Sequence, residues 1–194
     1  MSRQLEPYQL IERSIQKKFH KVLWTPFITA IKQYELIAPG DRIAVCISGG
    51  KDSMLMAKLL QLLQRHSDVP FEVIDLVMDP GYNAVNRQKT ESNAALLHIP
   101  VTIFETNIFD VTSGIEQSPC YLCARMRRGY LYSKARELGC NKIALGHHFS
   151  DVVETTVMGM FYGSEAAQPQ FPGHGAHPPH VLHPRGRHHR LAAL

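Results

Sequence analysis

The sequence contains a short glycine loop whose residue types suit the binding of a nucleotide's phosphates: Ser48, Gly49, Gly50, Lys51, Asp52 and Ser53. Two adjacent glycines let the backbone approach an anion, and a helix that starts directly after them offers free N–H groups and the positive end of its dipole. Ser48 and Ser53 add hydroxyl donors, and Lys51 adds positive charge. Asp52 is suited to hold a Mg²⁺ ion that bridges the phosphates. The pattern is shorter than the loop of kinases and GTPases and lacks its ending, so it predicts a different phosphate-binding site.

A pair of cysteines, Cys120 and Cys123, begins a predicted helix further along the chain. In a reducing compartment such a pair is more often a metal, cluster or redox site than a structural disulfide. Three arginines follow the pair: Arg125, Arg127 and Arg128. Like the lysines Lys17, Lys18 and Lys21 near the N-terminus, they favour either a nucleic-acid contact or a solvated helix face.

These residues must be positioned by regular elements, and the hydrophobic pattern predicts an alternation of strands and helices. The predicted strands are 42–47, 71–78, 101–105 and 142–145. The predicted helices are 8–36, broken at Pro26, then 52–65, 86–97, 120–138 and 151–161. Such an alternation predicts an α/β fold with a parallel sheet and helices on both faces. The glycine loop then lies between a buried strand and a helix.

The chain divides by composition into three parts. Residues 1–36 form a helical segment, residues 37–165 form the α/β domain, and residues 166–194 form a tail rich in His and Pro. The net charge of +4 owes much to this tail, which has no acid after residue 165. No apolar run of about 18 residues indicates a membrane span, and Met1–Arg13 lacks the apolar core of a signal peptide, so we expect a cytoplasmic protein.

The Ser-Gly-Gly-x-Asp-Ser loop after the first strand resembles that of the PP-loop ATP pyrophosphatases. The order of this loop, Cys120-x-x-Cys123 with its arginines, and Gly146-His147-His148 followed by Asp151 is similar to the tRNA 2-thiocytidine synthetases (the TtcA family). The likeness runs from about Glu12 to Glu165. It implies a Rossmann-like sheet of the adenine nucleotide alpha hydrolase type. It also implies ATP-dependent thiolation of a cytidine in a tRNA anticodon loop, through an adenylated base.

The resemblance also implies the site residues. The loop residues Ser48 to Ser53, together with Gly146 and His147, would bind ATP, and Lys51 and Asp52 would serve catalysis. Asp52 would hold Mg²⁺, and Asp151 would either assist the metal or cap its helix. Cys120 and Cys123 would be two of three ligands of a [4Fe-4S] cluster, whose open iron carries sulfur. The implied partners are tRNA and a sulfur donor such as a cysteine desulfurase, with a homodimer as a further expectation.

The chain departs from this family in two places. Ser150 stands before Asp151 where the family has a second aspartate, and no third cluster cysteine follows the 151–161 helix. Cys140 lies about 25 Å from Cys123 along a helix that rises about 1.5 Å per residue, and Cys46 lies in a predicted buried strand. We therefore expect a chain that is truncated and frame-shifted near Gly173–His174, with a non-native, disordered tail and no thiolation activity.

Three readings of the function stay open from the sequence. The first is a tRNA cytidine thiolase. The second is another PP-loop ATPase, either a tRNA 2-thiouridine synthetase or a lysidine synthetase. The third is a non-catalytic nucleotide-binding fragment in which Cys120 and Cys123 form a simple dithiol.

Overall fold

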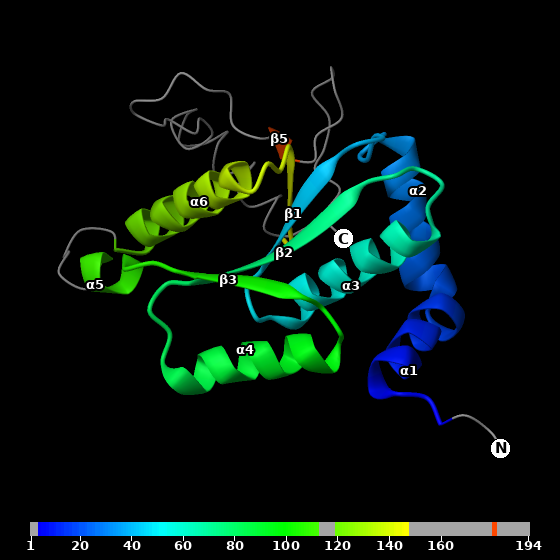
Figure 1. Cartoon of the computed structure of the whole chain (residues 1–194), viewed down its shortest axis with the longest axis horizontal. Helices are drawn as coiled ribbons and strands as arrows, with labels where there is room; N and C mark the ends of the chain where they lie inside the picture. The colour runs from blue at the N-terminus through cyan, green and yellow to red at the C-terminus, as the bar shows by residue number, and fades with distance from the viewer. Residues whose placement is uncertain (1–3, 113–118, 148–179, 182–194) are drawn as a thin grey trace, which may run out of the picture.

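The computed structural model describes residues 4–112, 119–147 and 180–181. Its strands form one sheet in the order β3-β2-β1-β4-β5 (Figure 1). The strands are β1 (Arg42–Ile47), β2 (Glu72–Asp79), β3 (Val101–Glu105), β4 (Lys142–Leu145) and β5 (His180–Val181). All neighbouring strands pair in parallel. Because β1 lies between β2 and β4, the chain order reverses beside it, which makes this a doubly wound, Rossmann-like sheet.

Alternate side chains of β1 enter two apolar cores on opposite faces of the sheet. Val45 and Ile47 pack in the core that contains residues of α3 (Lys51–His66) and α4 (Ala84–Leu96). Ala44 and Cys46 pack in the core that contains Ala135 of α6 (Pro119–Glu137). The predicted α/β fold with helices on both faces is therefore confirmed.

The N-terminal segment consists of α1 (Pro7–Arg13), two π-helical turns η1 (Ser14–Lys18) and η2 (His20–Trp24), and α2 (Thr25–Gln33). The predicted break at Pro26 is wrong. Pro26 lies in the first turn of α2, where its missing N–H costs nothing and its fixed φ fits a helix. The irregular backbone is instead at Phe19, with φ −102° and ψ 14° between the two π-helical turns.

Two elements differ from the sequence-based prediction. A short helix, α5 (Ile108–Thr112), follows β3 and was not predicted. β5 pairs with β4 inside the segment predicted to be disordered, and the rest of that segment lies outside the described residues, so its disorder stays a prediction. The predicted 151–161 helix lies outside the described residues. No described helix is both long and apolar enough to cross a membrane.

Candidate nucleotide-binding site

The loop of residues 48–53 joins β1 to α3 at the carboxyl edge of the sheet. Gly49 has a φ of +84°, which glycine adopts without strain. A Cβ at this position would lie 2.9 Å from Oγ1 of Thr90 on α4, so the close approach of two elements also requires glycine. Gly50 is still extended, with ψ 158°, and α3 begins at Lys51. The first N–H groups of a helix have no acceptor within the helix itself, and such a helix start suits an anion.

Ser53 holds the loop in shape from the inside. Its side chain is buried, and its Oγ accepts a hydrogen bond from the Ser48 N–H at 3.1 Å. The same hydroxyl donates to the Gly50 carbonyl at 3.0 Å and lies 3.2 Å from Oγ of Ser48. Ser48 is exposed. The structure therefore gives Ser53 a bracing role, and direct phosphate contact by either hydroxyl stays a prediction.

Gly146 brings the end of β4 against this loop. A Cβ on Gly146 would lie 3.1 Å from Cα and 3.2 Å from the backbone N of Ser53. His147, which follows, is exposed, and its N–H donates to the Leu145 carbonyl at 3.1 Å. Ligands of doubly wound sheets bind at the carboxyl edge where the strand order reverses, and here that place lies between β1 and β4. The structure thus brings together two predicted parts of the site that are far apart in sequence.

The charged residues of the loop lie in the first turn of α3. Lys51 is exposed and Asp52 is half-buried. Mg²⁺ is commonly bound by one or two carboxylates together with phosphate oxygens, so the single carboxylate of Asp52 fits a nucleotide-bound Mg²⁺. Within the described residues, no group of three or more His, Cys, Asp or Glu gathers to hold a metal by itself. Asp151 and His148 lie outside the described residues.

The helix with the cysteine pair begins at the same edge but covers the other face of the sheet. Cys123, in the second turn of α6, has a free and partly exposed thiol. The side chain of Cys120 lies outside the described part of the structure. Residues three apart lie on the same side of a helix, so the spacing of the pair in the sequence suits two ligands of one metal group. Fe–S clusters are held by such thiolates, so this donor pair fits part of a cluster's ligand set.

Two side-chain contacts tie α6 to the loops that leave β2 and β3. Nη2 of Arg127 donates to the hydroxyl oxygen of Tyr82 at 2.9 Å. The Tyr130 hydroxyl lies 3.4 Å from Oδ1 of Asn107, at the weak limit for a hydrogen bond. The Tyr82 ring also packs edge-on against Phe109 of α5, with 6.0 Å between ring centres. The start of α6 is therefore fixed relative to the carboxyl edge of the sheet.

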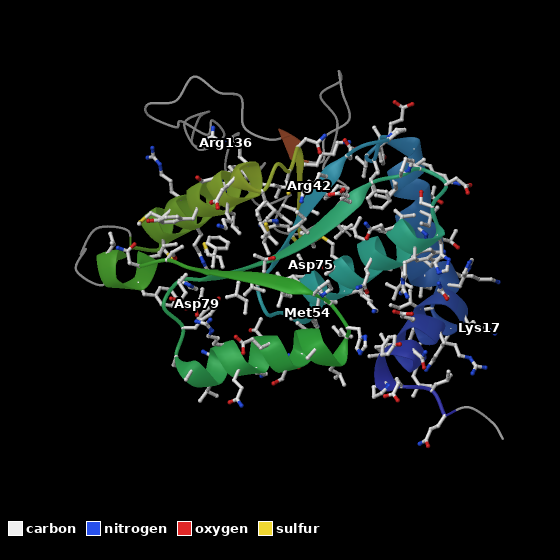
Figure 2. All side chains as sticks on the ribbon, in the orientation of Figure 1. Lys17, Arg42, Met54, Asp75, Asp79 and Arg136 are labelled. Atoms are coloured by element: carbon white, nitrogen blue, oxygen red, sulfur yellow. The ribbon has the colours of Figure 1, made fainter. Side chains whose placement is uncertain are left out.

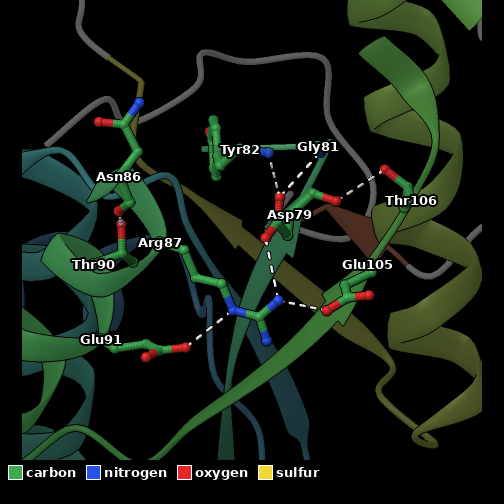
Figure 3. A network of polar contacts seen from close by, with 9 residues as sticks. All are labelled: Asp79, Gly81, Tyr82, Asn86, Arg87, Thr90, Glu91, Glu105 and Thr106. Carbon is green, nitrogen blue, oxygen red and sulfur yellow. Dashed lines mark hydrogen bonds and ion pairs between the residues drawn. The ribbon is translucent and has the colours of Figure 1, made fainter. Parts of the chain in front are cut away.

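Asp79, the last residue of β2, fixes the turn that presents Tyr82 (Figure 3). Its Oδ1 accepts hydrogen bonds from the N–H groups of Gly81 at 3.0 Å and Tyr82 at 2.7 Å. Its Oδ2 lies 3.5 Å from Nη1 of Arg87, which also pairs with Glu105. Both carboxylate oxygens are thus engaged within the protein. Asp79 therefore positions the edge of the site.

Two contacts at this edge of the sheet were not predicted from the sequence: that of Arg127 with Tyr82 and that of Thr90 with Gly49. Arg127 was identified only as a charge near the cysteine pair, and Tyr82 was not identified at all. The Asp79-Pro80-Gly81 turn has a recognisable local pattern, but nothing local indicates that Tyr82 meets an arginine in another helix. Thr90, which sits against Gly49, likewise has no sequence signal.

The chain is similar to a known protein family over most of its length. Residues 11–170 match the family model described as a PP-loop domain. The chain belongs to the PP-loop family.

Its relatives carry a shared name. The protein is 37% identical over 162 residues to the tRNA-cytidine(32) 2-sulfurtransferase of Alkalilimnicola ehrlichii, an alignment that covers 82% of this chain and 49% of the relative. It is 39% identical over 140 residues to the protein of the same name from Nitrosomonas europaea, covering 71% of this chain and 45% of the relative. The PP-loop protein therefore spans about half the length of the curated relatives it matches.

A solved structure supports the fold. The U34-tRNA thiolase NcsA from Methanococcus maripaludis, determined with its [4Fe-4S] cluster, aligns with a TM-score of 0.55 and 22% sequence identity. The alignment covers 70% of this chain and 50% of that one. At this identity the likeness concerns the fold alone.

Proposed function

We propose that this PP-loop protein carries the ATP-dependent, base-activating half of 2-thiocytidine formation on tRNA, in which the C2 oxygen of a cytidine is replaced by sulfur. As expected from the sequence, the chain as given should not complete the sulfur transfer. The observation that carries the proposal is the meeting of two sites at one edge. The 48–53 loop against Gly146 offers a phosphate cradle, and α6 begins at the same edge with its cysteine pair. The relatives named tRNA-cytidine(32) 2-sulfurtransferase supply the substrate class.

In the proposed reaction, the C2 oxygen of cytosine attacks the α-phosphorus of ATP, and pyrophosphate leaves. A sulfur nucleophile then attacks C2, and the C2–O bond breaks to release AMP. The N–H groups at the start of α3 would bind the phosphates, and the positive charge of Lys51 would offset the charge that develops on them. Asp52 would hold the Mg²⁺ that neutralises the departing pyrophosphate.

The cysteine helix would serve the sulfur-transfer half of the reaction. Cys120 and Cys123 would supply two ligands of a [4Fe-4S] cluster, and the other two cysteines of the sequence, Cys46 and Cys140, are buried elsewhere in the fold. Such a cluster, when bound, supplies an open iron site at which sulfide can be held. The contact of Arg127 with Tyr82 would fix the direction of the helix toward the nucleotide. A sulfur donor such as a cysteine desulfurase, a homodimer and a cytoplasmic location belong to the same proposal.

The test is to identify the nucleotide products. The protein is incubated with Mg²⁺-ATP and an unmodified tRNA transcript, and we expect AMP and pyrophosphate. Asp52→Ala should lower pyrophosphate release at least tenfold, whereas Asp68→Ala, an exposed aspartate beyond the far end of α3, should leave it unchanged. Formation of ADP and phosphate would show that the chemistry has been assigned to the wrong phosphorus.

A further inference from the structure

The N-terminal segment from residue 13 to residue 34 contains basic residues and no acid. Its cations are Arg13, Lys17, Lys18, Lys21 and Lys32. Side chains 17 to 22 are all exposed, and Lys17 lies on the outer side of the segment, away from the sheet (Figure 2). We call Lys17, Lys18 and Lys21 the basic surface. Within the described part of the chain, no carboxylate forms an ion pair with any of the three.

Several other cations at least partly exposed at the protein surface are neutralised by neighbours. Arg42 pairs with Glu72 at 3.1 Å, and Lys134 pairs with Glu137 at 2.7 Å. Arg87 is surrounded by carboxylates, with Glu91 at 3.2 Å as one of them. The basic surface differs because its positive charge is left for a partner. A surface of this kind attracts phosphate backbones.

Glu12, the acid that directly precedes the segment, is turned away from this surface. Oε1 of Glu12 lies 2.7 Å from Nζ of Lys58 and 2.5 Å from Nη2 of Arg65, both on α3. Hydrogen bonds from these two cations keep the pKa of Glu12 lowered despite its partial burial, which acts in the opposite direction. Glu12 therefore serves to dock the segment on α3, and the basic surface keeps its full charge.

The basic surface is also held rigidly. Ile15 and Phe27 are buried in the main core and flank the exposed residues on both sides. Between them the helix passes through two π-helical turns, which are rare and frequently occur at functional sites. Phe19, at their junction, is 38% exposed, and Nζ of Lys18 lies 5.2 Å from the centre of its ring. Fixed cations beside an exposed aromatic ring suit an RNA partner, which offers both phosphates and bases.

The position of the basic surface sets the size of the partner. α3 starts at the 48–53 loop and runs for 16 residues, or about 24 Å at about 1.5 Å per residue. Near its far end, Nε2 of His66 lies 3.1 Å from Nε2 of Gln16, next to Lys17. A ligand that reaches both the nucleotide and the basic surface must span about 20 Å. A mononucleotide is too short for this, whereas a folded RNA is long enough.

We infer that Lys17, Lys18 and Lys21 bind the phosphate backbone of the tRNA at a distance from the reacting base. The inference rests on the proposed function for the identity of the RNA. It assigns a docking surface to the N-terminal segment, outside the nucleotide site. The lysines act through charge and position the substrate, and they take no part in the chemistry.

The test measures tRNA affinity as a function of salt. The variant Lys17→Gln/Lys18→Gln/Lys21→Gln is compared with a control of equal charge, Lys89→Gln/Lys134→Gln/Arg136→Gln, using an unmodified tRNA transcript and fluorescence anisotropy. Each lost phosphate contact lowers the slope of log K against log salt by about 1, so we expect a fall of about 3 for the variant. We also expect at least tenfold weaker binding near 0.1 M salt, with ATP affinity and unfolding midpoint unchanged. The control should keep the parent slope.

Three results would overturn the inference, and they can be told apart. Unchanged tRNA affinity in the lysine variant would remove the docking surface and leave the proposed function standing. Binding to phosphatidylserine vesicles is measured for the parent protein and the lysine variant. If only the parent protein binds the vesicles and both bind tRNA equally well, the surface is a membrane contact. Failure of the parent protein to bind the transcript at low salt would overturn the docking surface and the proposed function together.

Discussion

Substitution of Gly146 by alanine tests whether the end of β4 shapes the nucleotide site. The new Cβ would lie 3.1 Å from Cα and 3.2 Å from N of Ser53. Both are backbone atoms, so neither can rotate away as a flexible side chain would. The loop or β4 must therefore move by a few tenths of an ångström. Overpacking of this kind costs about 1–3 kcal/mol.

Most of this cost should fall on nucleotide binding. β4 is held by its pairing with β1, whereas the 48–53 loop contains two glycines and has a more flexible backbone. The loop should therefore be the part that moves, and the loop is the part that binds the nucleotide in the proposed function. Since about 1.4 kcal/mol corresponds to a factor of ten, a cost of about 1–3 kcal/mol predicts ATP binding weakened by about 5- to 150-fold. Isothermal titration of Mg²⁺-ATP measures this directly.

Gly129→Ala provides the matched control. Gly129 lies in α6, and a Cβ there meets nothing within 4 Å. Alanine should stabilise the helix by about 1 kcal/mol relative to glycine and leave ATP affinity unchanged. If Gly146→Ala bound ATP as tightly as the parent protein, the proposed role of the β1–β4 edge in nucleotide binding would be refuted.

Three other perturbations have defined outcomes. Burial raises the pKa of Asp75 from 3.8 to about 7, and its Oδ1 has no hydrogen-bond partner among the described residues. Because the pKa of Asp75 is raised in the folded state, the free energy of unfolding of the parent protein should fall as pH rises from about 4 to 7. Urea unfolding should show that Asp75→Asn becomes more stable relative to the parent protein by up to about 4 kcal/mol over that range. Parallel plots of unfolding free energy against pH for the two proteins would contradict this. Cys123→Ser should lower iron content after anaerobic reconstitution at least twofold with ATP affinity unchanged, and equal iron in both proteins would remove Cys123 as a ligand. Lys58→Met breaks a buried ion pair with Glu12 and should lower the free energy of unfolding by about 3 kcal/mol. It should also make residues 13–25 accessible to protease. An unchanged cleavage pattern would show that this pair does not anchor the segment.

The sheet was predictable because its signals are local. Each predicted strand is a short apolar run, and a glycine-containing turn or loop follows β1, β2 and β4. The predicted bounds of β1, β3 and β4 agree with the structure, and β2 is shifted by one residue. The 48–53 loop was predictable for the same reason, since its strand, glycines and helix are consecutive.

The contacts that complete the site were not predictable, because they join residues that are distant in sequence. Arg127 and Tyr82, which share a hydrogen bond, are 45 residues apart in the sequence. Gly146, directly after β4, packs against Ser53 in the first turn of α3. The π-helical turns around Phe19 were not predictable either, because the spacing of apolar residues in that segment fits an ordinary α-helix equally well. Pro26 was misread as a break because a proline has the opposite meaning in the first turn of a helix and in its interior.

The two halves of the proposed chemistry are separated by the sheet and meet only at its carboxyl edge. The nucleotide loop leads into α3 on one face, and the cysteine pair begins α6 on the other. Parallel strands require this arrangement, since every helix that follows a strand starts at the same edge. In the proposed reaction, a base activated at the loop would meet a sulfur held at the start of α6 across this edge. The separation also means that the two ligand sites share no described side chain, so loss of the thiol of Cys123 should leave ATP binding intact.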